Sequence, residues 1–200
     1  MKKILYLIEF LFIKFLFIIF KLVGYKIASN LGFFIGRNFG NFFRKKKYII
    51  DNLNKSKISI NISDNQFANN VLGNYGRILA EYPYLKDFRK NKMEKFIKID
   101  GLENLNKIKN KKKPVVFISG HFNNFELMAM HIEKSGIDLA AIYRPLNNPF
   151  LNPLMENIRK KYICKKQIKK GITGTKEILK CFKSGTSIAL MIDQRVSQGI

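Results

Sequence analysis

The chain has few cysteines and few acidic residues, and both shortages limit the classes of protein to which it can belong. Only Cys164 and Cys181 occur in 200 residues, which excludes a disulfide-stabilised scaffold and a Cys-x-x-Cys metal site. Asp and Glu number 14 against 37 Lys and Arg, so the formal net charge is +23. Such an excess attracts nucleic acid, anionic lipid or acidic protein, and does not by itself choose among them.

Several catalytic and binding signatures are absent as well. There is no Gly-x-Ser-x-Gly nucleophile elbow, residues 171–176 are too short for a phosphate-binding P-loop, and no aromatic–basic RNA-binding signature occurs. Lys, Ile and Asn make up 78 of the 200 residues, which indicates a genome-wide residue bias. Part of the positive charge is therefore background. The apolar fraction of 46% nevertheless excludes a disordered basic tail.

A long apolar segment begins the chain. Residues 4–23 contain seventeen apolar residues and only three charged ones, Glu9, Lys14 and Lys21. As a helix this segment spans about 30 Å, the thickness of a bilayer core. Lys3, Lys14 and Lys21 fall near one line on that helix, which suits a helix lying in the membrane interface or one spanning it with this stripe against protein. The following residues are a poor cleavage site for a signal peptidase. We therefore expect a membrane-associated helix, with both arrangements open.

Two further features support a membrane anchor at the N-terminus. Gly32, Gly36 and Gly40 repeat every four positions, so on a helix they permit close approach of another helix. Packing within the chain is the preferred interpretation, and dimerisation is the alternative. The basic run at residues 44–47 marks the cytoplasmic side and attracts anionic headgroups. We expect residues 1–47 to form the anchor and residues 48–200 to form a cytosolic α/β domain.

The rest of the chain alternates predicted helices and strands. Apolar periodicity and breaker residues predict a helix at 63–82, capped by Ser63 or Asp64, and a loop or the end of a short helix at 104–113. A strand at 115–119, a helix at 124–135 and a strand at 139–143 follow. Next come a helix from Asn152 to about Tyr162, with Asn152 as cap and Pro153 at its first position, a helix at 175–183 and a strand at 187–192. This order predicts an α/β fold with a mixed, mostly parallel sheet flanked by helices.

Three polar residues each fall just past the end of a predicted strand. They are His121, Arg144 and Asp193. In open α/β sheets, ligands bind at the edge formed by the carboxyl ends of the strands. We therefore expect an imidazole, a guanidinium and a carboxylate to converge on one cleft.

His121 and Glu126 form the most informative local motif. On a single helix they would point about 140° apart, so they can meet only if His121 lies in the strand-to-helix turn and Glu126 in the first helical turn. A carboxylate beside a histidine orients it as a general base for a hydroxyl that attacks a carbonyl or thioester carbon. The alternative is a capping box from Asn123 to Glu126, which leaves His121 as a turn residue. His131 is expected to be structural. A metal site formed by His121, Glu126 and Asp193 is a further alternative, although no known ligand spacing fits it.

Taken in order, these features resemble the lipid A biosynthesis (late) acyltransferases, a bacterial lysophospholipid acyltransferase group with a His-x4-Asp/Glu motif. The likeness covers nearly the whole chain: the apolar N-terminus with its Gly-spaced helix, Asp51-Asn52-Leu53, Gly120-His121 through Glu126, Tyr143 to Pro149, Lys183-Ser184-Gly185 and Asp193-Gln194. The chain departs from the family at Asn123, where Gly is usual, at Phe125, where Trp is usual, and at Arg195. Family members continue further, so we expect this sequence to be C-terminally incomplete.

The resemblance implies transfer of an acyl chain from an acyl-carrier-protein thioester to a hydroxyl of a membrane glycolipid, a lipid A precursor, on the cytosolic side of the bacterial inner membrane. His121 would be the general base and Glu126 its partner. Arg144 would bind acceptor phosphate or donor, and Asn124 and Asp193 would support the site. No metal, redox cofactor or nucleic acid is implied. Alternatives are a glycerophospholipid or other lipid acceptor, another α/β transferase or hydrolase, and a non-catalytic basic protein that binds membranes or polyanions.

Overall fold

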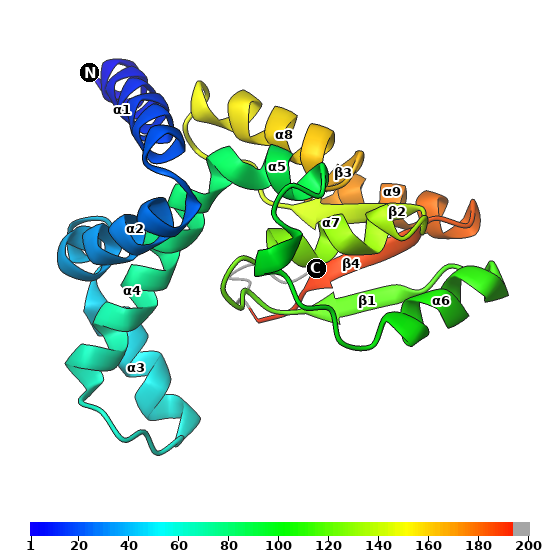
Figure 1. The fold of residues 1–200 in the computed structure, drawn as a ribbon, viewed down its shortest axis with the longest axis horizontal. Coiled ribbons are helices and arrows are strands. Elements are labelled where there is room, and N and C mark those ends of the chain that lie inside the picture. Colours follow the sequence, from blue (N-terminus) through cyan, green and yellow to red (C-terminus); the bar gives the residue numbers. More distant parts are fainter. Residues whose placement is uncertain (194–200) are drawn as a thin grey trace. The chain divides into compact units, whose positions relative to one another are not determined.

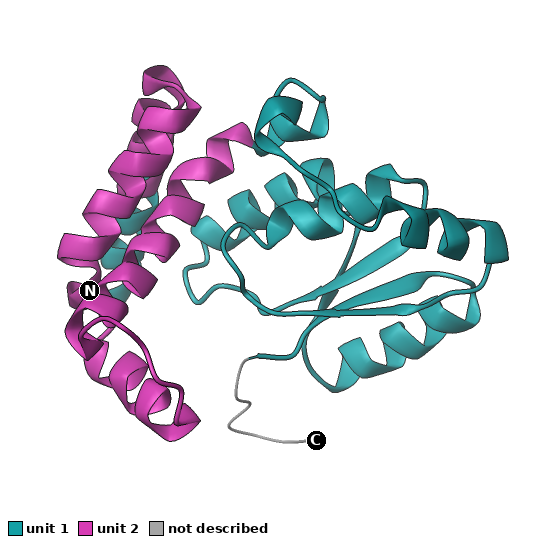
Figure 2. Ribbon diagram, turned by 60° about the horizontal axis from the view of Figure 1, so that its bottom comes forward, with its two compact units in different colours: residues 1–11, 85–200 teal, residues 12–84 magenta. Residues whose placement is uncertain are grey.

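A computed structural model describes residues 1–193 of the chain. Gln194, which matches the family that the chain resembles, and Arg195, which departs from it, lie outside the described residues. The chain divides into two compact units, one of residues 12–84 and one of residues 1–11 together with those from Leu85 onward (Figure 2). The first helix, α1 (Lys2–Val23), contributes to both units.

The unit of residues 12–84 is helical (Figure 1). After α1 it contains α2 (Tyr25–Phe39), the 3-10 turn η1 (Gly40–Phe42), α3 (Lys46–Ser56), α4 (Asp64–Glu81) and the 3-10 turn η2 (Tyr82–Tyr84). Ser63 is the N-cap of α4, and its hydroxyl accepts a hydrogen bond from the backbone N–H of Gln66 at 3.3 Å. One of the two predicted caps of this helix is therefore confirmed.

The glycine repeat of α2 packs against α4. A Cβ atom added to Gly32 would lie 2.5 Å from the carbonyl oxygen of Gly76, and one added to Gly36 would lie 2.4 Å from the carbonyl oxygen of Leu72. Only glycine at these positions lets the two helix backbones approach so closely. The preferred interpretation of the repeat, packing within the chain, is confirmed.

Polar contacts join α1 and α2 to the end of α4. The buried Ser29 hydroxyl donates to the carboxylate of Glu81, also buried, at 2.7 Å. In the turn that follows α4, the Lys21 ammonium donates to the carbonyl oxygen of Pro83 at 3.2 Å and lies 4.4 Å from the centre of the Tyr84 ring. At least the Lys21 end of the predicted cationic stripe therefore lies against protein.

Within residues 1–193, no helix combines the length and the apolar character that crossing a membrane requires. The spanning arrangement that we left open for residues 4–23 is therefore not found. Glu9, Lys14 and Lys21 interrupt the apolar sequence of α1.

The second unit contains the sheet. Beyond the start of α1 it consists of α5 (Leu85–Arg89), η3 (Glu94–Phe96), α6 (Leu102–Lys111), β1 (Val116–Ser119), α7 (Glu126–Lys134), β2 (Leu139–Tyr143), α8 (Leu151–Tyr162), β3 (Lys166–Lys169), α9 (Ile172–Lys183) and β4 (Ser187–Met191). The segment at 104–113, left open as a loop or the end of a short helix, thus contains the end of the helix α6. Gly136 (φ 90°) and Gly185 (φ 86°) follow α7 and α9 at the predicted stops.

The described strands form one four-stranded sheet in the order β1-β4-β2-β3, and every neighbouring pair is parallel. Helices α7 and α8 lie over one face and α9 over the other (Figures 1 and 2), as right-handed crossovers require. Ala140, Ile168 and Ile188 form a buried cluster against α9, with Ile178 and Cys181 of that helix packed on it. The α/β class is confirmed, and the sheet is wholly parallel rather than mixed.

Strand β3 is absent from the sequence-based prediction. Among the described strands it lies at the edge of the sheet and pairs only with β2, and of its four residues only Ile168 is buried. An edge strand with one buried side chain has no continuous apolar run, which was the signal used to find the other three.

Helix α9 also starts three residues earlier than predicted. Its Gly174 packs so closely on the end of β3 that an added Cβ would meet the carbonyl oxygen of Lys169.

The predicted cap of α8 is wrong. The helix begins at Leu151, one residue before Asn152. The Asn148 side-chain oxygen instead accepts from the backbone N–H groups of Phe150 and Leu151, at 2.9 and 3.0 Å. Asn152 lies inside the helix, where its side-chain oxygen accepts from the N–H of Leu146 at 2.8 Å. Both asparagines fit a capping pattern in sequence, and the loop geometry selects Asn148.

The close contact of α2 with α4 leads to a first prediction. Gly36→Ala places a methyl group against the backbone of α4, so we expect the unfolding free energy to fall by about 1–3 kcal/mol. Arg37→Ala, at the exposed next position of the same helix, should change it by less than about 0.5 kcal/mol. Urea unfolding followed by circular dichroism measures both. Equal stability of the two variants would contradict the close approach.

Candidate active site

The strand order brings three of the predicted site residues to one edge of the sheet. Strand β4 lies between β1 and β2, with Ser119 of β1 paired to Met191 of β4. His121 comes two residues after β1, Asp193 two residues after β4 and Arg144 directly after β2. All three therefore follow the carboxyl ends of adjacent parallel strands, the usual location of ligand sites in such sheets.

His121 and Asp193 are in direct contact. The Asp193 carboxylate accepts the backbone N–H of His121 at 2.7 Å with Oδ2, while Oδ1 lies 2.8 Å from Nδ1 of the imidazole. Because an ionised carboxylate only accepts hydrogen bonds, Nδ1 is the protonated nitrogen in this pair. A Cβ on Gly120 would lie 3.2 Å from Oδ2 of Asp193 and 2.8 Å from the Phe122 ring. Glycine at position 120 thus leaves room for the carboxylate.

The same hydrogen bonds set the charge state of Asp193. Burial raises the pKa of its carboxyl group, but the bonds from the backbone and the ring of His121 outweigh that effect. The net pKa lies below the ordinary value of 3.8. Asp193 is therefore an anion at neutral pH, and its carboxylate orients the neighbouring imidazole.

In the turn between β1 and α7, His121 and Glu126 occupy the two positions in the chain that would allow them to meet. His121 lies in the turn and Glu126 is the first residue of α7. Asn123 has φ 45°, in the left-handed region that favours glycine and tolerates asparagine. This conformation accounts for the Asn at a position where the family that the chain resembles usually has Gly. The Phe125 ring packs edge-on against the imidazole, with centroids 4.5 Å apart.

The capping-box alternative for Glu126 does not fit this turn. The N-cap residue of α7 is Phe125, and no side-chain hydrogen bond caps the helix there. Asn123 lies two residues before that cap, and its carbonyl oxygen accepts from the N–H of Phe125 at 3.0 Å. Its side chain is thus not in the capping position that the alternative assigned to it.

Glu126 is bound by an arginine of α8. Its Oε1 accepts from Nε and from a terminal nitrogen of Arg159, both at 2.8 Å. The two side chains are 8% and 17% exposed, so this ion pair is largely shielded from water, and removal of one partner is costly. Sequence reasoning missed Arg159, although the chain has only 7 Arg against 30 Lys. In so lysine-rich a sequence, each arginine is a candidate for a contact that needs the rigid, planar set of donors of a guanidinium.

The remaining predicted residues lie in the surrounding loops. Arg144 is exposed and forms no ion pair within residues 1–193. Asn124 is half-buried in the turn, and its carbonyl oxygen accepts from the N–H of Leu127 at 3.1 Å. In the described part of the chain, no group of three His, Cys, Asp or Glu side chains is arranged to hold a metal ion.

The loop after Arg144 is fixed by the start of α1. Asn148 is buried, and its side-chain nitrogen donates to the carbonyl oxygen of Tyr6 and to the carboxylate of Glu9, both at 2.8 Å. The rings of Phe10 and Phe150 lie beside this contact, with centroids 6.3 Å apart. Residues 1–11 thus belong to the sheet unit and hold the loop that carries Arg144.

Comparison with known proteins identifies the family. The family model for bacterial lipid A biosynthesis acyltransferases matches residues 1–199. The chain belongs to this family. It is thus an acyltransferase of lipid A biosynthesis, and the family implies an acyl donor and a lipid acceptor. A search of curated proteins gave no significant match.

The Arg159–Glu126 pair gives a second prediction. Arg159→Ala removes two charge-assisted hydrogen bonds from a carboxylate that stays buried, so the unfolding free energy should fall by about 3 kcal/mol. Lys160→Ala is the matched control, because Lys160 forms a half-exposed pair with Glu156 one turn earlier on α8 at 2.8 Å, worth less than about 0.5 kcal/mol. Chemical unfolding measures both variants. A loss at Arg159 no larger than at Lys160 would contradict a shielded pair.

The lowered pKa of Asp193 gives a third prediction. Asp193→Asn imitates the protonated carboxyl, so wild type should be more stable than the variant above pH 3.8, the ordinary pKa, and the difference should disappear as the pH falls through the lower folded-state pKa. Urea unfolding midpoints at a series of pH values measure it. Asp100→Asn should have little effect at any pH, because Asp100, paired with Lys98, is 79% exposed. A stability difference that grew on acidification would have the wrong sign.

Proposed function

We propose that this chain transfers a fatty acyl group from an acyl-carrier-protein thioester to a hydroxyl group of a lipid A precursor. The observation that carries the proposal is the His121–Asp193 pair at the carboxyl edge of a parallel sheet. In an acyltransferase, this is the geometry of an oriented general base. Asp193 binds Nδ1, so Nε2 is the nitrogen that accepts a proton from the acceptor hydroxyl.

In the proposed reaction, His121 removes the hydroxyl proton as the oxygen attacks the thioester carbon. Asp193 stabilises the imidazolium that forms, as the third group of a catalytic triad does. The tetrahedral intermediate then breaks its carbon–sulfur bond. The imidazolium returns the proton to the departing thiolate, so the acyl group ends on the acceptor oxygen and the carrier leaves as a free thiol. No group of the protein is consumed.

Glu126 and Arg144 have supporting roles in this proposal. Glu126 is the carboxylate of the His-x4-Asp/Glu motif, and Arg159 binds it at the first turn of α7. Arg144, exposed at the same sheet edge, binds phosphate of the acceptor or of the donor, and Asn124 supports the turn. An acidic carrier protein and a phosphorylated lipid both suit a chain with net charge +23.

The proposed location is the cytosolic face of the bacterial inner membrane. Residues 1–47 serve as the membrane-associated region and residues 48–200 carry the catalysis. Exposed apolar side chains of α1, among them Leu11, Phe15 and Leu22, support attachment to a membrane surface, since amphipathic helices lie in that interface.

Acyl transfer by His121 is the fourth prediction. Membranes carrying the full-length protein should acylate a lipid A precursor with acyl-carrier-protein as donor, and His121→Ala should lower kcat about 10²–10⁴-fold. His131→Gln is the control, because that half-buried histidine lies five residues into α7 and away from the turn. Mass spectrometry of the lipid product measures the transfer, with equal protein amounts verified by immunoblot.

The same assay distinguishes the alternatives. Product on a glycerophospholipid and none on the lipid A precursor would replace the proposed acceptor. Equal turnover by His121→Ala and wild type would overturn the assigned mechanism. Lipid analysis of cells with and without the intact gene gives an independent check, since the proposed function requires one acyl chain to be missing from lipid A.

A further inference from the structure

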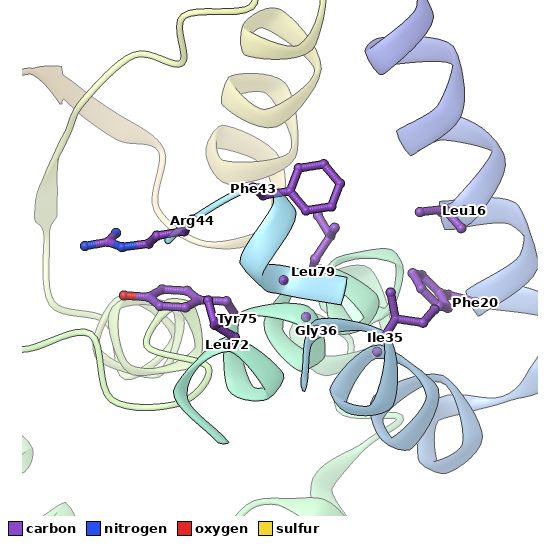
Figure 3. A pocket seen from close by; sticks show the side chains of 12 residues that line it. Leu16, Phe20, Ile35, Gly36, Phe43, Arg44, Leu72, Tyr75 and Leu79 are labelled. Atoms are coloured by element: carbon purple, nitrogen blue, oxygen red, sulfur yellow. The ribbon is translucent and has the colours of Figure 1, made fainter. Parts of the chain in front are cut away.

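The helical unit contains an apolar cavity that the proposed acyl transfer does not use. Its volume is about 260 Å³, and all of its lining residues lie within residues 12–84. Side chains of α1, α2 and α4 form most of its wall: Leu16, Phe20, Ile35, Leu72 and Leu79 (Figure 3). Pockets for drug-sized ligands measure roughly 300–1,000 Å³. This one is at the lower limit and suits a slender apolar ligand.

Glycines form part of the cavity wall. Gly32, Gly36 and Gly40 of the α2 repeat line it together with Gly76 of α4. Their backbones are hydrogen-bonded within the helices, so this part of the wall offers hydrocarbon contact and almost no free polar group. A void of this kind loses the dispersion contacts of its lining atoms while it is empty. An apolar chain that filled it would restore those contacts.

One end of the cavity is polar. Figure 3 shows the Arg44 guanidinium and the Tyr75 hydroxyl pointing to the same side, away from Leu16 and Phe20. The guanidinium carbon lies 6.0 Å from the centre of the Tyr75 ring. Arg44 is exposed, and within residues 1–193 no carboxylate forms an ion pair with it. This end therefore presents one cation and one hydroxyl donor without a negative partner, which is complementary to an anion.

The neighbouring surface indicates where such a ligand would come from. Phe42 and Phe43 are 86% and 85% exposed, and Phe43 is part of the cavity wall. Lys45 and Lys47 follow Arg44 and are also exposed. Exposed apolar rings beside a basic cluster are typical of segments that lie in the interface of an anionic bilayer. The cavity thus opens where a membrane lipid would reach it.

We propose that this cavity binds one acyl chain of an anionic membrane phospholipid, with the phosphate at Arg44 and Tyr75. The ligand is a structural lipid rather than a substrate. The inference does not rest on acyl transfer, because no residue that lines the cavity belongs to the unit that carries His121.

Photo-crosslinking tests the proposal. The full chain is placed in nanodiscs of phosphatidylcholine that contain a small amount of phosphatidic acid with a diazirine in one acyl chain. After irradiation, mass spectrometry locates the labelled peptides. We expect the label to concentrate on the lining segments, residues 16–20, 32–44 and 72–79, and to be weak on the outward apolar positions of α1.

Two variants act on the two ends of the ligand. Leu79→Trp fills the cavity and should lower labelling of these segments at least fivefold, whereas Phe34→Trp, at an exposed α2 position outside the cavity, should not. Arg44→Gln removes the cation and should lower labelling by phosphatidic acid about fivefold, with no change for a diazirine-labelled diacylglycerol. Arg37→Gln removes the same charge from an exposed site of the same helical unit and should have no effect. Circular dichroism verifies that each variant is folded.

Three results would overturn the proposal. One is label spread evenly along α1 and unchanged by Leu79→Trp. Another is equal labelling of wild type and Arg44→Gln by phosphatidic acid. The third is a dimer in which a second copy of the chain covers the cavity and excludes the probe. His121→Ala should label as wild type does. Cavity labelling in a protein that transfers no acyl group would support this inference and contradict the proposed function.

Discussion

Both oxygens of the Asp193 carboxylate bind His121, and that contact depends on β1 and β4 being neighbours in the sheet. The two residues are 72 positions apart, so no local element brings them together. The chain must form β2 and β3, return by α9 and insert β4 beside β1 before the carboxylate reaches the ring. In the sheet unit, insertion of β4 beside β1 and assembly of the histidine pair are therefore one event. Gly120 directly follows the last residue of β1 and, because it has no side chain, leaves room for Oδ2 of Asp193.

The charges of this protein act at two levels. Most of the 30 Lys are solvated and supply a diffuse positive field, which favours polyanions without selecting one. Several arginines make defined contacts instead. Arg159 binds the buried Glu126, Arg89 binds Glu133 at 2.6 Å, and Arg77 lies 4.8 Å from the centre of the Phe33 ring. The rigid, planar guanidinium group suits such contacts, and the flexible ammonium group of a lysine does not replace it. The site geometry therefore depends on few charges, although the composition suggests many.

The sequence predicts the sheet edge better than it predicts the contacts made there. Strands β1, β2 and β4 are continuous apolar runs, so their positions and the polar residues after them could be found without a structure. Strand β3 could not, since burial of Ile168 alone leaves no pattern. The sequence placed Asp193 and His121 at the same edge but could not predict their direct hydrogen bond, because the order of strands along the chain does not reveal that β4 lies next to β1. Likewise Asn148 and Asn152 look equivalent as caps, and only the course of the loop distinguishes them.

The glycine repeat of α2 contributes both to the contact between α2 and α4 and to the wall of the cavity. Without side chains at Gly32 and Gly36, the backbones of α2 and α4 come together, and the shape of that junction is set by the backbone rather than by packed side chains. The same glycines, together with Gly40 and Gly76, also form part of the cavity wall. A larger residue at Gly32, Gly36 or Gly76 would meet the backbone of the facing helix and force the two helices apart, so this part of the wall stays bare backbone. A lipid chain of the kind we propose would contact this wall without adding atoms to the helix junction.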